Sequence, residues 1–326
     1  MTFWKRCQNT YWNRSRGMSI RLRSETSGDE EAIDIVNCRA FGEMDEANLV
    51  RLLRTYYPAF DRRYSITAWD DEQLVGHALF TPAQIRLMGK TVKALAVGPV
   101  AVLPESQRTG IGGELLRRGH ELGKRDGFRL TFLLGHPEYY PRHGYKACFG
   151  FARVTIDTEN LPPATQKFHR SPVQLADVPW LVERYAAEWA EVDFGWLWGM
   201  NLNEWTIPCV SAMLWWTEDG RRAAYTLAKS GGWPQESKWK MMLAEDPMLA
   251  REVISTIKPK TLEHHPSGWL AKNVLDPKWG TAEVNASRAA MACELEEGIL
   301  QPYLQALESN EHLPGFCNWP LPFMLC

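Results

Sequence analysis

The sequence of 326 residues predicts an α/β protein with two domains. Two observations support this prediction. A strand, a glycine-rich turn and a helix follow one another between Ala94 and Arg125, and tryptophan becomes frequent beyond Pro163. The chain is long enough to bury a sizeable core in each part. We therefore expect a disordered extension over residues 1–17, a first domain over residues 18–163 and a second, smaller α+β domain over residues 164–326.

The composition narrows the possible functions. A hydrophobic content of 45% and a charged content of 23% are typical of a globular protein. The net charge of −2 predicts neither a nucleic-acid nor an anionic-membrane partner, and no apolar run approaches the ~20 residues that a membrane span needs. The seven cysteines are dispersed without a C-x-x-C pair, and His264 and His265 are adjacent, so we expect no metal site. We expect a cytoplasmic protein with reduced thiols.

Residues 1–17 carry four basic side chains, no acid and no apolar core segment, so they do not form a secretory signal. A short organellar presequence remains an alternative. We favour a disordered tail, because Met18 opens a plausible first strand over residues 19–23.

The hydrophobic pattern predicts the elements of the first domain in order. On the expected first helix, Ile33, Val36 and Ala40 recur on one face, and the polar turn 70–72 joins two strand-like segments into a hairpin. The expected order is a strand over residues 19–23, helices over 29–41 and 46–54, strand-like segments over 65–69 and 73–81, and a segment over 85–92 that turns at Gly89-Lys90 and leads into the next strand.

The glycine-rich turn is the most informative stretch. Small and β-branched residues from Val97 to Val102 indicate a buried strand that Pro104 ends, and after the turn 107–113 apolar residues recur at helical spacing until Asp126. Backbone N–H groups at a helix start can hold a phosphate, and we expect glycine there because a Cβ would keep the ligand away from the backbone and would restrict φ. The turn matches neither a Walker A loop nor a full dinucleotide fingerprint.

The pattern Val102-x-Pro104-x-x-Gln107-x-x-Gly110-Ile111-Gly112 resembles the acetyl-CoA motif of the GNAT N-acetyltransferases. An apolar strand over residues 128–134 follows, and then Tyr140-x-x-x-Gly144-Tyr145 resembles the closing motif of the same family. The longer form from Gly135 is similar to the YhbS-like branch. The resemblance covers about residues 18–158 and implies the GNAT fold, in which helices flank a mixed central sheet.

The resemblance implies acetyl-CoA as the co-substrate. Its pantetheine arm would pair with the backbone of the strand, and its pyrophosphate would bind the turn. The matching positions are Val100, Ala101 and Val102 on the strand and Gln107, Arg108, Thr109, Gly110, Ile111, Gly112 and Gly113 in the turn. Arg108 would add positive charge. The Gln107 position is often arginine in the family, so we expect a contact mainly through its backbone.

The resemblance also implies catalytic roles. Tyr140 is the candidate acid, because a phenol with a pKa of ~10 lies close to the range of the thiol product. His136 is the candidate base, since histidine has a suitable intrinsic pKa. Glu138, the loop residues Glu43 and Asp45, and a water relay remain alternatives for the base.

The second domain holds most of the fifteen tryptophans. We expect helices over residues 176–190 and 247–257, strands over 222–229 and 238–244, and another helix within 282–307 that breaks near Pro302. The domain resembles a degenerate repeat of the first one, without a second acetyl-CoA motif. Its tryptophans either fill its core, which we favour, or form a binding surface. It would wall the acceptor pocket or mediate contact in a homodimer.

These features favour an acetyl-CoA-dependent N-acetyltransferase that moves an acetyl group directly to a primary amine. The alternative is an acyl-CoA-binding sensor or interaction module without turnover. Because the net charge is near zero, nothing points to a protein tail as acceptor, and a small-molecule amine is favoured. The sequence does not reveal which amine.

Overall fold

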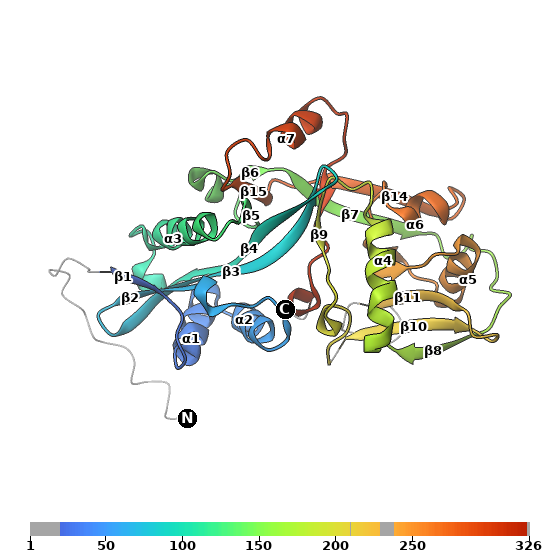
Figure 1. Ribbon diagram of the computed structural model, residues 1–326, viewed down its shortest axis with the longest axis horizontal. Helices are drawn as coiled ribbons and strands as arrows, with labels where there is room; N and C mark the ends of the chain where they lie inside the picture. Colours follow the sequence, from blue (N-terminus) through green and yellow to red (C-terminus); the bar gives the residue numbers. More distant parts are fainter. Residues whose placement is uncertain (1–19, 209, 229–237, 325–326) are drawn as a thin grey trace.

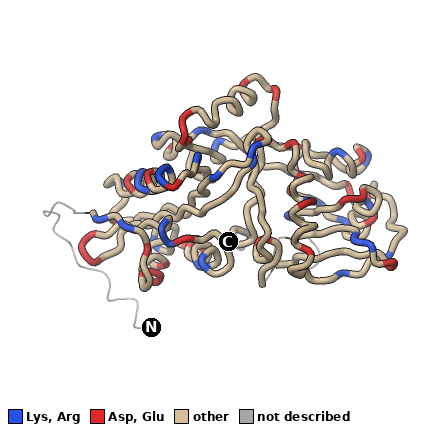
Figure 2. Tube along the Cα trace, in the orientation of Figure 1, with Lys and Arg blue, Asp and Glu red and all other residues tan. Residues whose placement is uncertain are grey.

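The computed structural model describes residues 20–208, 210–228 and 238–324, and the predicted extension over residues 1–17 lies outside them. Two eight-stranded sheets lie side by side, with helices on their faces (Figure 1). No helix in the described ranges has the length and apolar character to cross a membrane. Basic and acidic residues are mixed along the chain, as on α3 (Ile111–Arg125) (Figure 2).

Sheet 1 is built mostly from the first half of the chain. Every strand pair in it is antiparallel except β4 with β5. Its order is β1 (Ile20–Ser24), β2 (Ser65–Asp70), β3 (Gln73–Leu87), β4 (Lys90–Val102), β5 (Leu130–Leu134), β15 (Ala290–Glu294) and β6 (Lys146–Ala147), and β9 (Phe194–Leu197) pairs with the far end of β3.

Helices cover both faces of sheet 1. α1 (Glu30–Phe41) and α2 (Asp45–Tyr56) lie on one face and α3 on the other (Figure 1). Acidic residues open α1 and Gly42 ends it in the left-handed region, which suits the helix dipole and the turn. A Cβ on Gly119 would lie 2.0 Å from Cζ of Phe80, so only glycine lets α3 approach β3 this closely.

Sheet 2 contains strands from both halves of the chain. α4 (Val178–Glu188), α5 (Pro247–Ile257) and α6 (Trp269–Asn273) pack on it, and Val154, Val253 and Leu262 are buried in its own core. The sheet order is β14 (Gly280–Ala286), β7 (Phe149–Ile156), β13 (Thr261–Leu262), β12 (Lys238–Leu243), β11 (Arg222–Ala228), β10 (Ser211–Thr217) and β8 (Phe168–Pro172), and β16 (Gly315–Phe316) pairs with β7.

The two sheets repeat one pattern. The series β1, β2, β3, β4, β5 and the series β8, β10, β11, β12, β13 each contain three antiparallel pairings followed by one parallel pairing. In each series a helix lies between the last two strands, α3 in one and α5 in the other. The second half of the chain therefore repeats the topology of the first.

The halves also exchange strands. β7, from the first half, pairs antiparallel with β13 in sheet 2, while β15, from the second half, pairs antiparallel with β5 in sheet 1. Chain on both sides of residue 163 thus contributes to both sheets. A division of the chain into units at this residue stays a prediction.

Most of the predicted elements are confirmed, and the helix expected within residues 282–307 is wrong. That stretch forms β14, β15 and the short α7 (Gln301–Glu308). On β14, Glu283 and Asn285 are exposed while Ala282 and Val284 are partly buried, which is the period of a strand. The hairpin between β3 and β4 turns at Met88-Gly89 instead of Gly89-Lys90, and both turn residues have positive φ.

Several tryptophans of the second half lie in the core, as favoured from the sequence, but four of these pack in the core cluster that both halves share, and Trp239 and Trp319 line a cleft. The core includes Trp189, Trp196, Trp198, Trp205, Trp215 and Trp279. Large aromatic side chains supply much of the apolar area that a sheet pair needs to bury.

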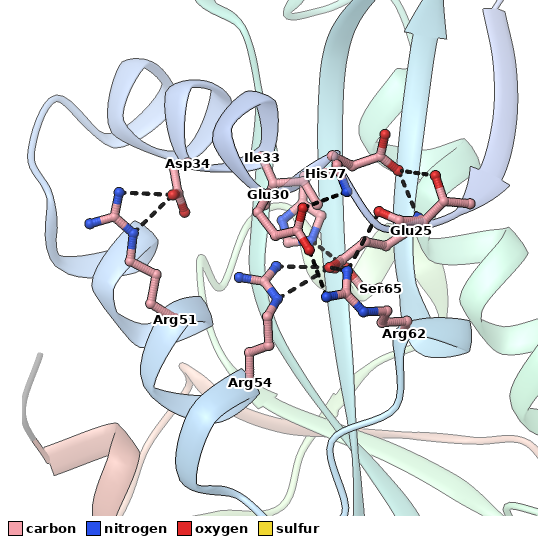
Figure 3. Close-up of polar contacts among 12 residues, drawn as sticks. Glu25, Glu30, Ile33, Asp34, Arg51, Arg54, Arg62, Ser65 and His77 are labelled. Carbon is pink, nitrogen blue, oxygen red and sulfur yellow. Dashed lines mark hydrogen bonds and ion pairs between the residues drawn. The ribbon is translucent and has the colours of Figure 1, made fainter.

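A buried polar network ties α1 and α2 to sheet 1 (Figure 3). The Glu25 carboxylate, whose side chain is fully buried, accepts hydrogen bonds from Arg54 at 3.0 Å and from the Ser65 hydroxyl at 2.5 Å. The Ser65 oxygen lies 2.9 Å from Nε2 of His77, and Nδ1 of His77 lies 3.1 Å from the Asn37 amide. Burial lowers the pKa of His77 from 6.5 to about 3, so the ring is neutral. Nδ1 then accepts from Asn37 and Nε2 donates to Ser65.

We predict that His77→Gln lowers the free energy of unfolding at pH 7 by about 2–3 kcal/mol, because Ser65 and Asn37 lose a buried partner. The difference from the wild type should shrink on acidification. The unfolded chain takes up a proton on His77 below its usual pKa of 6.5, while the folded chain does not until about 3, so wild-type stability falls with pH through this window.

Urea unfolding at pH 7 and pH 5 measures both effects. Glu72→Gln, in the exposed turn between β2 and β3, is the control. An equal difference between wild type and His77→Gln at the two pH values would show that the His77 ring does not resist protonation.

We also predict that the fragment 18–163 does not fold cooperatively. It lacks β15, so the edge of β5 with the buried Leu130 and Phe132 has no strand beside it, and it lacks the sheet partners of β7. Thermal unfolding followed by circular dichroism, and gel filtration, check this when the fragment and the full chain are measured separately and compared. A monomeric fragment with a sharp thermal transition would contradict it.

Candidate functional site

The candidate site begins where β4 and β5 separate. These parallel strands are paired only from Ala94 to Ala96, opposite Leu130 to Phe132, while β4 continues to Val102 against β3 alone. The Leu103 N–H donates to the Val75 carbonyl of β3, so by alternation the N–H groups of Val100 and Val102 point away from β3. This edge of β4 lacks a strand partner among the described residues.

A cleft with a volume of about 1210 Å³ lies beside the free edge. It reaches from α1 and α2, past β4 and the end of β5, to the exposed face of sheet 2. Residues on its walls include Phe41, Glu46 and Leu49 from the helices, Val97, Val100, Val102, Gln107, His136 and Tyr140 around the free edge, and Phe151, Lys240, Glu263, Trp319 and Phe323 from the rest of the chain. Both halves of the chain therefore build the cleft.

The turn after β4 presents backbone donors at the mouth of the cleft. Arg108 has a φ of 64° and Gly110 a φ of 94°, and the first turn of α3 begins directly after them. The N–H groups of a first helical turn have no partner within the helix, so they can bind an anion. The side chain of Gln107 donates to the Val102 carbonyl at 3.1 Å, and its backbone N–H, through which we expected a contact, donates to the Pro104 carbonyl at 3.4 Å.

Two of the glycines also make room for another part of the chain. A Cβ on Gly112 would lie 2.6 Å from the hydroxyl oxygen of Tyr139, and one on Gly113 would lie 2.9 Å from Cε1 of His143. These glycines therefore admit the turn over Tyr140–His143 against α3. Gly110 has a positive φ, which is the backbone freedom expected of a glycine in this turn.

Tyr140 is packed in place beside the end of β5. A Cβ on Gly135 would lie 2.2 Å from Cε2 of Tyr140, so the phenol ring lies directly on that glycine. Its ring also contacts Tyr139 and Tyr145 edge-on, with centroids 5.1 and 5.6 Å away. Burial raises the pKa of Tyr140 to about 12. Within the described ranges no residue hydrogen bonds its hydroxyl, which therefore remains available to a ligand in the cleft.

The candidate bases are placed very differently. His136 is exposed and lines the cleft, and its carbonyl accepts from the N–H of Tyr139 at 3.0 Å. Glu138 is exposed and pairs with Arg288 at 2.9 Å. Glu43 and Asp45 are exposed, and neither belongs to the cleft wall. The His136 carbonyl also accepts from the Tyr140 N–H at 3.4 Å, and no side-chain hydrogen bond joins these two residues in the described structure.

The cleft wall contains three carboxylates that the sequence did not single out, Glu263 and Glu283 on the sheet 2 side and Glu46 on the first turn of α2. Its Oε2 is buried and has no hydrogen-bond partner in the described structure. Burial raises the pKa of Glu46, and the neighbouring Glu43 and Asp45 carboxylates raise it further. In the sequence Glu46 is one of three acids at a helix start, so no signal separated it from its neighbours.

The second half of the chain holds the end of β5 in place. The Gly135 N–H donates to the Ala289 carbonyl at 2.9 Å, and β15 continues from there along β5. The cleft wall on this side includes Phe316, Trp319 and Phe323 from the C-terminal segment. The Trp319 and Phe323 rings lie 5.2 Å apart, and Trp319 also contacts Phe132 of β5.

In sheet 2 the corresponding place is filled. β12 and β13 are paired only at Lys238–Trp239 with Thr261–Leu262. Beyond that pair the Met242 N–H donates to Nε2 of His264 at 2.9 Å, and Nδ1 of His264 lies 2.8 Å from the buried carboxylate of Glu188. Side chains of the chain itself thus occupy this edge, whereas the matching edge in sheet 1 faces the cleft.

Comparison with known proteins identifies the family. Residues 21–148 match the Acetyltransferase (GNAT) domain family. The Escherichia coli protein described as uncharacterized N-acetyltransferase YjhQ is 39% identical over 125 residues, which are 37% of this chain and 67% of that protein.

Solved structures share the fold over most of the chain. A GCN5-related N-acetyltransferase from Kribbella flavida has a TM-score of 0.64 at 17% identity, over 84% of this chain and 71% of its own. A probable N-acyltransferase from Enterococcus faecalis has a TM-score of 0.66 at 14% identity, over 87% and 74%. At such identities the likeness concerns the fold alone. The sequence matches place the free edge of β4, the turn and Tyr140 inside the matched domain, and the chain therefore belongs to the GNAT acetyltransferase family.

Proposed function

We propose that this enzyme transfers an acetyl group from acetyl-CoA directly to a primary amine. One observation above all supports the proposal. The free edge of β4, Gln107 of the turn and Tyr140 line one cleft, which is large enough for two substrates, and the first turn of α3 begins shortly after Gln107. A hydrogen-bonding edge, an anion site and a proton donor are what a thioester donor with a pyrophosphate requires.

In this proposal the backbone of Val100, Ala101 and Val102 holds the pantetheine arm, and residues 107–113 hold the pyrophosphate. The side chain of Arg108, in the exposed turn, adds a charge-assisted contact to a phosphate oxygen. The strand edge and the helix start are both rigid, so the thioester carbonyl is oriented before the amine arrives.

The reaction moves one proton from the amine nitrogen to the thioester sulfur. The neutral amine attacks the thioester carbonyl, a tetrahedral oxyanion forms, and its collapse breaks the carbon–sulfur bond. A backbone N–H on the free edge of β4 stabilises the oxyanion. With a pKa of about 12, Tyr140 stays protonated at neutral pH and can donate a hydrogen bond to the departing sulfur. The pKa of Tyr140 is therefore higher than the ~10 expected from the sequence and lies further from the pKa of the thiol product. For this reason Tyr140 assists the departure of the sulfur more by a hydrogen bond than by full transfer of its proton.

His136 remains the candidate base, because it lines the cleft near Tyr140. An exposed imidazole can take the proton directly or through water. The proposal also assigns roles to the two parts of the chain, which exchange strands: residues 18–163 carry the donor site, and residues 164–326 form a repeat that has lost its own site and walls the acceptor side. A cytoplasmic location is supported by the four described cysteines, which are free thiols.

We predict that Tyr140→Phe lowers kcat by roughly 100-fold, the lower range for loss of a proton-donating group. The affinity for acetyl-CoA should change little, because the ring packing on Gly135 is kept. Tyr139→Phe is the matched control, since its hydroxyl lies against Gly112 and outside the cleft wall. Thiol release with a panel of amines measures kcat, and calorimetry with acetyl-CoA measures the affinity. Binding without release in the wild type would favour the sensor without turnover.

We predict that Gly110→Ala weakens acetyl-CoA binding about tenfold or more, because alanine disfavours the left-handed backbone that aims the turn, at a cost of roughly 1–2 kcal/mol. Gly28→Ala is the control, since Gly28 has a φ of 98° and also has no atom within 4 Å of an added Cβ. The Gly28→Ala variant should lose about as much stability as Gly110→Ala and keep the wild-type affinity for acetyl-CoA. Equal loss of affinity in both variants would contradict a specific role for the turn.

A further inference from the structure

The part of the cleft wall formed by α1, α2 and the C-terminal segment is apolar apart from one carboxylate. The end of α1 supplies Phe41, the first turns of α2 supply Glu46 and Leu49, and the C-terminal segment supplies Trp319 and Phe323. These elements lie together, since the short helix over Leu321–Met324 packs against α2. The sheet 2 wall of the cleft carries charges of both signs, the ion pair of Lys240 with Glu263 and also Arg153, Lys238 and Glu283.

The Glu46 carboxylate is incompletely satisfied. Its Oε2 is buried without a hydrogen-bond partner, although most buried polar atoms in proteins have one. By contrast, the buried Glu25 carboxylate receives Arg54, Arg62 and Ser65. A buried carboxylate oxygen without a partner is costly, and a cationic or hydrogen-bond-donating ligand in the cleft would remove that cost.

Resting on the proposed function, we propose that Glu46 binds the amino group of the acceptor and that Phe41, Leu49, Trp319 and Phe323 bind an aromatic or other apolar body attached to it. The substrate class is thus a primary amine with an apolar body, in preference to a polyamine or an amino sugar. One carboxylate matches one ammonium group, and the aromatic walls match an apolar remainder.

The position of Glu46 in the cleft also allows it to orient the nitrogen of the acceptor amine. It lies on the first turn of α2, and the wall of the same cleft contains Val97 and Pro99 of β4 and His136 and Tyr140 after β5. An amine held by Glu46 therefore lies in the same cleft as the thioester that β4 would orient. Glu46 is a positioning and specificity residue in this arrangement.

The test uses the full chain and compares 2-phenylethylamine with two partial analogues, 2-phenylethanol, which lacks the charge, and ethanolamine, which lacks the apolar body. Calorimetric titration of each gives an affinity that does not depend on turnover. We expect 2-phenylethylamine to bind most tightly. Glu46→Gln should weaken its binding roughly tenfold or more, as for loss of a hydrogen bond to a charged group. Binding of 2-phenylethanol should be unchanged in this variant.

Glu43→Gln is the matched control, because Glu43 is an exposed carboxylate three residues away that does not line the cleft. It should keep the wild-type affinity for 2-phenylethylamine within about twofold at physiological salt, where exposed charges are screened. Unchanged acetyl-CoA binding by Glu46→Gln shows that this variant is folded with an intact donor site.

Three results would overturn the inference: equal binding of 2-phenylethylamine by wild type and Glu46→Gln, equal binding of the amine and the alcohol by the wild type, or tighter binding of ethanolamine than of 2-phenylethylamine. Failure of the proposed function has a different signature. In that case 2-phenylethylamine binds and depends on Glu46, yet acetyl-CoA releases no thiol in its presence. The Glu46 site would then stand while the transfer reaction would not.

Discussion

The parting of β4 from β5 after Ala96 is the constraint on which the rest of the site depends. A parallel pair that separates leaves a row of backbone donors and acceptors on the edge of β4, while its other edge stays fixed to β3. The turn over residues 107–110 and the start of α3 then fall at the end of this row. The closing turn with Tyr140 packs against the same helix start, because Gly112 and Gly113 leave room for it.

The exchange of strands makes the site a product of the whole chain. β15 is placed beside β5, and its preceding residue Ala289 holds the Gly135 N–H next to Tyr140. The same half repeats the strand pattern of sheet 1, but its equivalent edge is blocked where His264 accepts from the Met242 N–H. A duplicated topology thus retains one open edge, and the second half contributes walls to the cleft of the first.

Two carboxylates of the first half, Glu25 and Glu46, differ in their hydrogen-bond partners. Glu25 is surrounded by donors, and through Ser65 it joins the neutral His77 to a network that fixes α1 and α2 (Figure 3). Glu46 lines the cleft, and its buried Oε2 accepts no hydrogen bond in the described structure. A satisfied buried charge supports the fold, whereas an unsatisfied one in a cleft points to a ligand.

The local elements follow from short-range patterns in the sequence. The strand before Pro104, the turn 107–113, the helix after it and the strand before Gly135 could be predicted, because hydrophobic period, glycine and proline act over a few residues. Pairing between distant strands has no such local pattern. Besides β4, β5 pairs with β15, far along the chain, so residues 290–294 form a strand where a helix was predicted. The wall of the cleft that contains Glu46 likewise includes Trp319 and Phe323 from the C-terminal segment, which packs against α2, and no local pattern records a contact between such distant residues.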